Sequence, residues 1–182
     1  MTEILEKNQP GLSIKRAHGR VINVVADLLR KQLHIPNVYL NPKISGIQGV
    51  DVLAVDRAGS GDIHVIEIKI LAIFPTRSQL RALLKPIQEL PFHYKYLALP
   101  GFSTDLSDAK KFSDYAELFD DSGIGRIGII SFDSRILHIS SIIDSSSVAL
   151  TVRPERFRVN SDQLTSVEKF LAKAKPDMEV RI

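Results

Sequence analysis

The sequence of 182 residues contains no cysteine and no long uninterrupted run of apolar residues. The absence of cysteine excludes structural disulfides and thiolate metal sites. No window approaches the roughly eighteen consecutive apolar residues expected of a membrane-spanning helix. Residues 1–16 lack the apolar core of a secretory signal. We therefore expect a cytoplasmic protein that has no membrane partner.

The composition is that of a globular protein, with 44% hydrophobic and 25% charged residues. The length suits a single domain, and the sequence contains no internal repeat or low-complexity tract. Residues 1–14 are polar and irregular and include the helix breaker Pro10–Gly11. We therefore predict an irregular segment at 1–14 and one domain at 15–182.

The basic residues are most concentrated near the N-terminus. The net charge of the whole chain is only +3, so the charge allows a nucleic-acid partner without requiring one. The cluster consists of Lys15, Arg16, Arg20, Arg30 and Lys31, with His18 and His34 nearby. These side chains form either a solvated helix face or a phosphate-binding stripe.

Hydrophobic periodicity predicts an alternation of helices and strands. The predicted helices are 15–33, 77–90, 107–119 and 161–175, with Pro86 as a kink or an early stop in the second. The predicted strands are 37–41, 50–56, 63–71, 94–99, 124–132, 136–143 and 149–152. This order indicates an α/β fold in which a mixed central sheet is flanked by helices.

The two segments 50–56 and 63–71 form a predicted β-hairpin, because both are rich in β-branched residues and the linking segment is rich in turn formers. On the second strand, Glu67 and Lys69 are bracketed by apolar residues. The period of two in a strand places both on one side, with Cα atoms about 6.5–7 Å apart. If Asp51 faces the same way, two carboxylates and a lysine converge on one patch.

A Glu-x-Lys triplet on a strand is also a common surface pattern, and alone it favours an exposed edge strand. Two features favour a site instead. The strand around Glu67 and Lys69 is too apolar on both sides for an ordinary edge, and Asp51 lies in the preceding strand.

Two neighbouring carboxylates repel each other unless a cation or a proton lies between them. Mg²⁺ is commonly held by one or two carboxylates, waters and substrate phosphate oxygens, so Asp51 and Glu67 are candidate ligands for Mg²⁺ or Mn²⁺. The backbone carbonyl of Ile68 is a further candidate oxygen ligand. Lys69 would orient or help deprotonate the attacking water, or stabilise charge in the transition state.

The segments GVDVLAVD (49–56) and HVIEIK (64–69) resemble the core of the PD-(D/E)xK nuclease superfamily, which has the restriction-endonuclease-like fold. The resemblance covers about residues 15–100 and includes the order helix, three strands, helix, strand. It implies that Asp51, Glu67 and Lys69 are catalytic and that the protein is a metal-dependent nuclease acting on nucleic acid, with DNA expected ahead of RNA. Many members also carry a glutamate on the first helix, where this chain offers only the acid Asp27.

Supporting residues are suggested by position. In several relatives the helix after the triplet contributes a glutamine or a basic residue, which makes Gln79 and Arg81 candidates for nucleic-acid contacts. Lys43, in the loop before Asp51, could approach a backbone phosphate. An exposed polar helix face is the simpler explanation for Gln79 and Arg81, and Lys43 is suggested by its position only.

Two functions therefore stay open after the sequence is read. The first is a divalent-metal-dependent nuclease, compatible with a homodimer because cutting both strands of a duplex requires two sites. The second is a module that keeps the nuclease fold but binds nucleic acid or a protein partner without turnover. A small-molecule α/β enzyme has no supporting motif.

Overall fold

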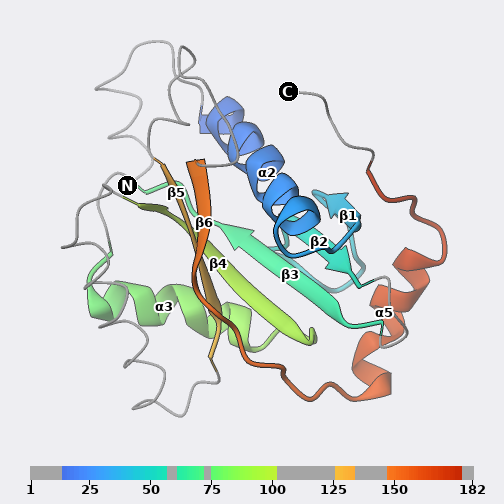
Figure 1. Ribbon diagram of the computed structural model, residues 1–182. Coiled ribbons are helices and arrows are strands. Elements are labelled where there is room, and N and C mark those ends of the chain that lie inside the picture. The colour runs from blue at the N-terminus through green and yellow to red at the C-terminus, as the bar shows by residue number, and fades with distance from the viewer. Residues whose placement is uncertain (1–13, 57–60, 72–74, 102–125, 134–146, 178–182) are drawn as a thin grey trace.

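The computed structural model describes residues 14–56, 61–71, 75–101, 126–133 and 147–177, which form three helices and a six-stranded sheet (Figure 1). The helices are α2 (Ile14–Lys31), α3 (Arg77–Gln88) and α5 (Ser161–Leu171). The strands are β1 (Asn37–Leu40), β2 (Val52–Val55), β3 (Ile63–Ile68), β4 (Tyr94–Gly101), β5 (Gly128–Asp133) and β6 (Val148–Val152). The predicted α/β class with a mixed sheet is confirmed.

The strands lie in sequence order across the sheet, from β1 at one edge to β6 at the other. The pairs β1–β2, β2–β3 and β5–β6 are antiparallel, whereas β3–β4 and β4–β5 are parallel. The predicted hairpin is β2–β3, in which Val52 pairs with Ile66 and Val55 pairs with Ile63. Because β3 is flanked by β2 and β4, Glu67 belongs to a central strand rather than to an edge, and Lys69 follows directly after that strand ends.

The two faces of the sheet are covered by different helices. α2 packs on one face, where its apolar side chains meet Val52, Ile66 and Ala98. α3 packs on the other face against Leu97 and Leu99. α5 covers the same face nearer the β1 edge, through Val167 and other side chains that meet Tyr39, Leu53 and Val65. Within the described residues no helix is long and apolar enough to cross a bilayer.

Local sequence signals set the ends of α3. Thr76 is the N-cap of α3, and its side chain accepts a hydrogen bond from the Gln79 backbone N–H. In return, the Gln79 side chain accepts the Thr76 backbone N–H at 2.9 Å, which completes a capping box. Pro86 lies inside the helix, which ends two residues later at Gln88. The prediction of an early stop is therefore confirmed in the last turn, where proline removes a hydrogen bond.

The second half of the chain is described only in part. The strand predicted at 136–143 lies outside the described residues. In the described part of the chain, β5 pairs with β4 in parallel and with β6 in antiparallel orientation. The helix predicted at 107–119 also lies outside the described residues.

Candidate functional site

Asp51 lies directly before β2, at the end of the sheet where β3 terminates. Its backbone N–H donates to Ile66 O at 3.1 Å, and its carbonyl accepts from Asn41 N at 2.8 Å. Its side-chain Oδ2 accepts a hydrogen bond from the backbone N–H of Ile68 at 2.6 Å. These three bonds fix the carboxylate next to the backbone that joins Glu67 to Lys69.

Glu67 is a buried acid in a strand of buried residues. Its exposed fraction is 8%, and every residue of β3 from Ile63 to Ile68 is buried. A carboxylate in such a place must be partnered by charge or hydrogen bonds, and Oε1 forms an ion pair with Lys69 Nζ. The Lys69 side chain is 35% exposed, so the pair reaches from the sheet interior to solvent.

The register of the hairpin brings the two acids together. Val52 pairs with Ile66 in the antiparallel ladder, and one further step of that register sets Asp51 opposite Glu67. The structure therefore links the three residues that the sequence analysis selected: the Asp51 carboxylate contacts the backbone between Glu67 and Lys69, and Lys69 Nζ contacts the Glu67 carboxylate.

Gly49 brings the loop before β2 close to the Glu67 carboxylate. A Cβ at this position would lie 3.6 Å from Glu67 Oε1 and 3.8 Å from Oε2. Its φ of +75° is in the left-handed region, which glycine adopts without steric cost. The left-handed turn into β2, rather than the space beside Glu67, is therefore what favours glycine here.

His18 is the site residue that the sequence analysis did not select. Its Nε2 lies 3.3 Å from Asp51 Oδ1, with the two side chains 28% and 20% exposed. Asp27, the acid that α2 offers, instead pairs with Lys31 at 3.0 Å, about 13 Å farther along the helix axis than His18. Only the docking of α2 on the sheet reveals this contact, because nothing in the spacing distinguishes His18 within the basic cluster.

The donor chemistry of the site fits a hard divalent cation. Asp51 and Glu67 offer carboxylate oxygens, and Mg²⁺ commonly takes one or two carboxylates and keeps several waters. Among the described residues no group of three or more His, Asp or Glu side chains could hold a metal ion. The protein side chains therefore supply a part of a coordination shell, which water and substrate would have to complete.

The weaker candidates are placed as follows. Lys43 is exposed in the loop between β1 and β2, where it lines a hollow of about 550 Å³ together with Ser45, Gln48 and Gly49. Gln79 and Arg81 are exposed on α3. Gln79 has a structural role, because its side chain completes the cap of that helix.

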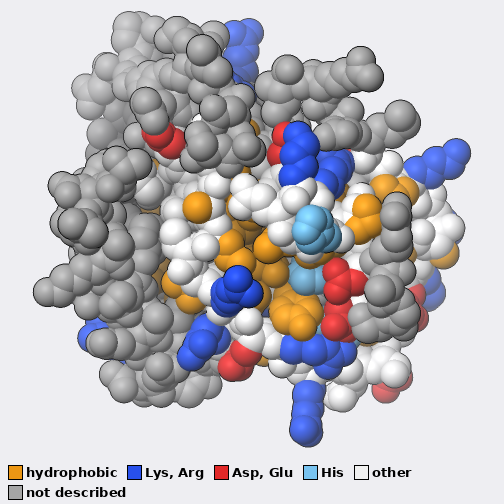
Figure 2. Space-filling model, in the orientation of Figure 1, with side chains coloured by type: hydrophobic (Ala, Val, Ile, Leu, Met, Phe, Trp, Pro, Cys, Tyr) orange, Lys and Arg blue, Asp and Glu red, His pale blue; other side chains and the backbone are white. Residues whose placement is uncertain are grey.

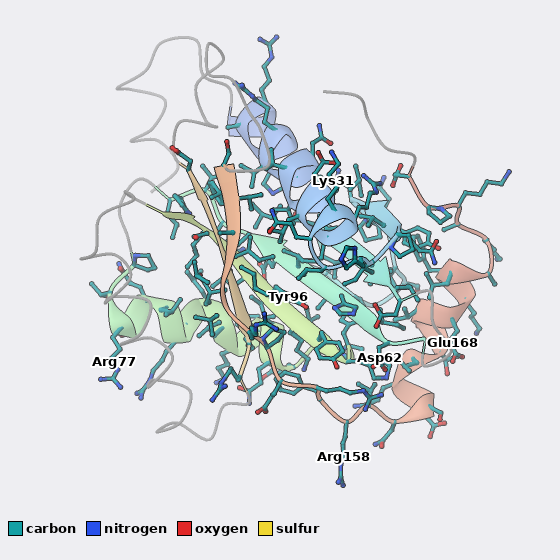
Figure 3. The ribbon with its side chains drawn as sticks, viewed as in Figure 1. Lys31, Asp62, Arg77, Tyr96, Arg158 and Glu168 are labelled. Atoms are coloured by element: carbon teal, nitrogen blue, oxygen red, sulfur yellow. The ribbon has the colours of Figure 1, made fainter. Side chains whose placement is uncertain are left out.

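A second group of buried polar side chains lies at the opposite end of β3 and β4, five residues or about 17 Å along the strand from Glu67. Figure 2 shows acidic, basic and histidine side chains gathered over this end of the sheet. Asp62, labelled in Figure 3, accepts two hydrogen bonds from the Arg156 guanidinium, at 2.9 and 2.7 Å. These bonds hold the pKa of the Asp62 carboxyl below its usual value. They tie the segment between β6 and α5 to β3.

Two histidines complete this second group. His64 Nδ1 lies 3.1 Å from Tyr96 Oη, and its Nε2 lies 3.3 Å from Asp56 Oδ1 without hydrogen-bond geometry. His93 Nδ1 accepts the backbone N–H of Ile63 at 3.0 Å. Burial lowers the pKa of both histidines, so both are neutral near pH 7. The contacts indicate a structural role for this end of the sheet.

No family model and no curated protein matches the chain. Two solved structures are similar to it. One is SPO1766, a protein of unknown function from Silicibacter pomeroyi, with 18% identity, a TM-score of 0.47, and coverage of 86% of this chain and 84% of that chain. The other is YaeQ from Xanthomonas axonopodis pv. citri, with 12% identity, a TM-score of 0.34 and coverage of 84% of each chain. Neither similarity assigns the chain to a family or an activity.

Proposed function

We propose that this chain is a divalent-metal-dependent nuclease that hydrolyses phosphodiester bonds, with DNA as its substrate. The observation that carries the proposal is the 2.6 Å hydrogen bond from Ile68 N–H to Asp51 Oδ2. It joins an acid 17 residues away in sequence to the residue between Glu67 and Lys69. Burying the Glu67 carboxylate in a central strand costs free energy that an apolar side chain would not, which supports a functional role for the acid.

Asp51 and Glu67 would hold the metal ion through carboxylate oxygens. In an extended strand, the N–H and the C=O of one residue point toward the same neighbour. The Ile68 N–H points at the Asp51 carboxylate, so we expect the Ile68 carbonyl to point to that side as well. The bound ion would polarise the phosphodiester and lower the pKa of a coordinated water.

Lys69 and His18 would serve this centre from two directions. Lys69 Nζ is held at the site by Glu67. From there it would orient or help deprotonate the attacking water, or stabilise negative charge on the phosphate. His18 would act as a positioning residue, because it contacts Asp51 Oδ1 while Ile68 N–H holds Oδ2.

The test is cleavage of plasmid, single-stranded DNA and RNA by the purified protein with Mg²⁺ or Mn²⁺. Wild-type protein is expected to cut, and Lys69→Ala to lose at least about a hundredfold in rate, the usual contribution of a positioned acid or base. Lys173→Ala, at an exposed lysine after α5, is the matched control and should cut like wild type. Cleavage that survives Lys69→Ala refutes the assigned roles. If both strands of a duplex are cut at one place, we expect a homodimer in analytical ultracentrifugation.

One observation favours a second function, that of a nuclease-fold module without turnover that binds nucleic acid or a protein partner. Each acid already has a basic partner, since Glu67 contacts Lys69 and Asp51 contacts His18. With these contacts, both carboxylates have a side-chain partner without a metal ion. No cleavage of any nucleic acid, together with no heat of Mn²⁺ binding in calorimetry, would replace the nuclease by this module.

A further inference from the structure

A groove lies between α2 and the end of β1, beside the Asp51 site. Its volume is about 500 Å³, within the range of small-molecule binding sites. It is lined by Arg16, Gly19, Arg20, Ile22, Asn23, Leu40 and Asn41. The lining therefore combines two guanidiniums, two amides and a floor of aliphatic side chains.

The charged side chains that line the groove are all positive. Arg16 and Arg20 lie four residues apart on α2, which is about one turn and 6 Å along the axis. No Asp or Glu is among the lining residues. A guanidinium presents a planar fork of donors that matches two phosphate oxygens, and Asn23 and Asn41 add neutral amide donors.

The groove borders the site on its strand side. Its lining residue Asn41 donates its backbone N–H to the carbonyl of Asp51 at 2.8 Å. His18 does not line the groove, but it contacts Asp51 Oδ1 at 3.3 Å from the same helix that carries Arg16 and Arg20. Asp51 is therefore in direct contact with one lining residue and with the helix that forms the other wall.

The helix wall leaves room for a ligand. A Cβ built on Gly19 would have no atom within 4 Å, so the space beside the helix backbone is open between the two arginines. The Arg16 side chain is exposed and Arg20 is partly buried. Both side chains line the groove, so a ligand in the groove can reach them.

We infer that this groove binds the phosphodiester backbone of the substrate strand next to the bond that is cut. Arg16 and Arg20 take phosphate oxygens, and the aliphatic floor formed by Ile22 and Leu40 lies against the sugars. The inference rests on the proposed nuclease function. It assigns two residues of the basic cluster on α2, Arg16 and Arg20, to phosphate binding rather than to a solvated helix face.

The test is binding of a short fluorescein-labelled DNA single strand, and of its duplex, measured by fluorescence anisotropy in EDTA so that nothing is cut. Arg16→Gln/Arg20→Gln is expected to weaken binding at least about tenfold at about 0.1 M salt. The slope of log Kd against log salt should fall by about 1.4 for the single strand or about 1.8 for the duplex, as expected for two lost phosphate contacts. The form with the larger affinity loss is the one the groove binds.

Arg153→Gln/Arg158→Gln removes the same charge from two other exposed arginines and is the matched control. Figure 3 shows Arg158 pointing away from the molecule. This variant should bind like wild type. If both double variants lose affinity equally, the effect is one of net charge and the groove proposal is refuted. The proposal is also refuted if neither variant loses affinity, or if wild-type protein binds no DNA.

Two milder variants keep the test valid if the double glutamine variant folds poorly, and circular dichroism checks the fold of each. They are Arg16→Lys/Arg20→Lys and the single variant Arg16→Gln. The lysine variant should keep most of the salt slope, and Arg16→Gln should lose about half of the effect. Groove-dependent binding without cleavage by wild type would retain the groove and remove the nuclease. Cleavage and binding that are insensitive to Arg16 and Arg20 would retain the nuclease and remove the groove.

Discussion

Lys95 gives the sharpest prediction from the energetics of the fold. It lies on β4 with an exposed fraction of only 4%. Its Nζ donates to the Gln88 carbonyl at the end of α3 and lies 4.1 Å from the centre of the Phe157 ring. No acid forms an ion pair with it among the described salt bridges, and burial lowers the pKa of the ammonium from 10.5 to about 8.

This shift makes the stability of the protein rise with pH in a defined window. Between pH 8 and 10.5 the unfolded chain keeps the Lys95 proton, while the native protein has lost it. Stability rises with pH wherever the unfolded state binds more protons. The difference of 2.5 pH units corresponds to about 3 kcal/mol at 1.36 kcal/mol per unit.

The assay is urea unfolding of wild type and Lys95→Met at a series of pH values from 7 to 10.5. Methionine removes the titrating group at similar length, so the free energy of unfolding of wild type minus that of Lys95→Met isolates Lys95. We expect this difference to grow by about 3 kcal/mol across the window. Lys173→Met, at an exposed lysine, should give parallel curves. Parallel curves for Lys95→Met would show that its ammonium is not desolvated.

Three further predictions concern the rest of the structure. Arg156→Gln should lower the urea midpoint at pH 7, and the deficit should vanish as the pH falls through the pKa of Asp62, which the guanidinium holds below 3.8; equal deficits at all pH values would contradict this. His64→Gln should lose less stability than wild type between pH 7 and 5 in thermal melts, because burial lowers the His64 pKa below 6.5 and acid favours the unfolded chain. Gly49→Ala should cost about 1–2 kcal/mol in urea unfolding, because its φ of +75° is left-handed; unchanged stability would contradict it.

The hairpin was readable from the sequence because local signals agree there. β-branched residues on two segments and turn formers between them predict β2 and β3, and the apolar residues around Glu67 predict a central strand. The register then follows from the alternation of side chains, since a slip of one residue would turn Glu67 to the other face. The predicted β2–β3 hairpin is confirmed, and its register sets the backbone of Asp51 opposite that of Glu67.

His18 and the groove were not readable because they depend on how α2 docks. A helix places a new residue on each 100° of its circumference, so the sequence gives its apolar face but not which polar residue meets the strand ends. Asp27 is the acidic residue type expected on this helix, but it pairs with Lys31. His18 is the residue of the helix that contacts Asp51.

The sequence also could not predict which strands pair with β5. The apolar run at 124–132 predicted a strand correctly, and β5 runs from Gly128 to Asp133. Its neighbours are β4 in parallel and β6, which begins fifteen residues after β5 ends. Periodicity identifies a buried strand but carries no information about which strand lies beside it.

The measurement that tests the central claim most directly is a crystal structure of the wild-type protein soaked in Mn²⁺, with the ion located by its anomalous signal. The nuclease account predicts one ion bound by carboxylate oxygens of both Asp51 and Glu67, with the Ile68 carbonyl as a further ligand and waters completing the shell. An ion bound elsewhere, with the Lys69–Glu67 and His18–Asp51 contacts unchanged, would contradict it.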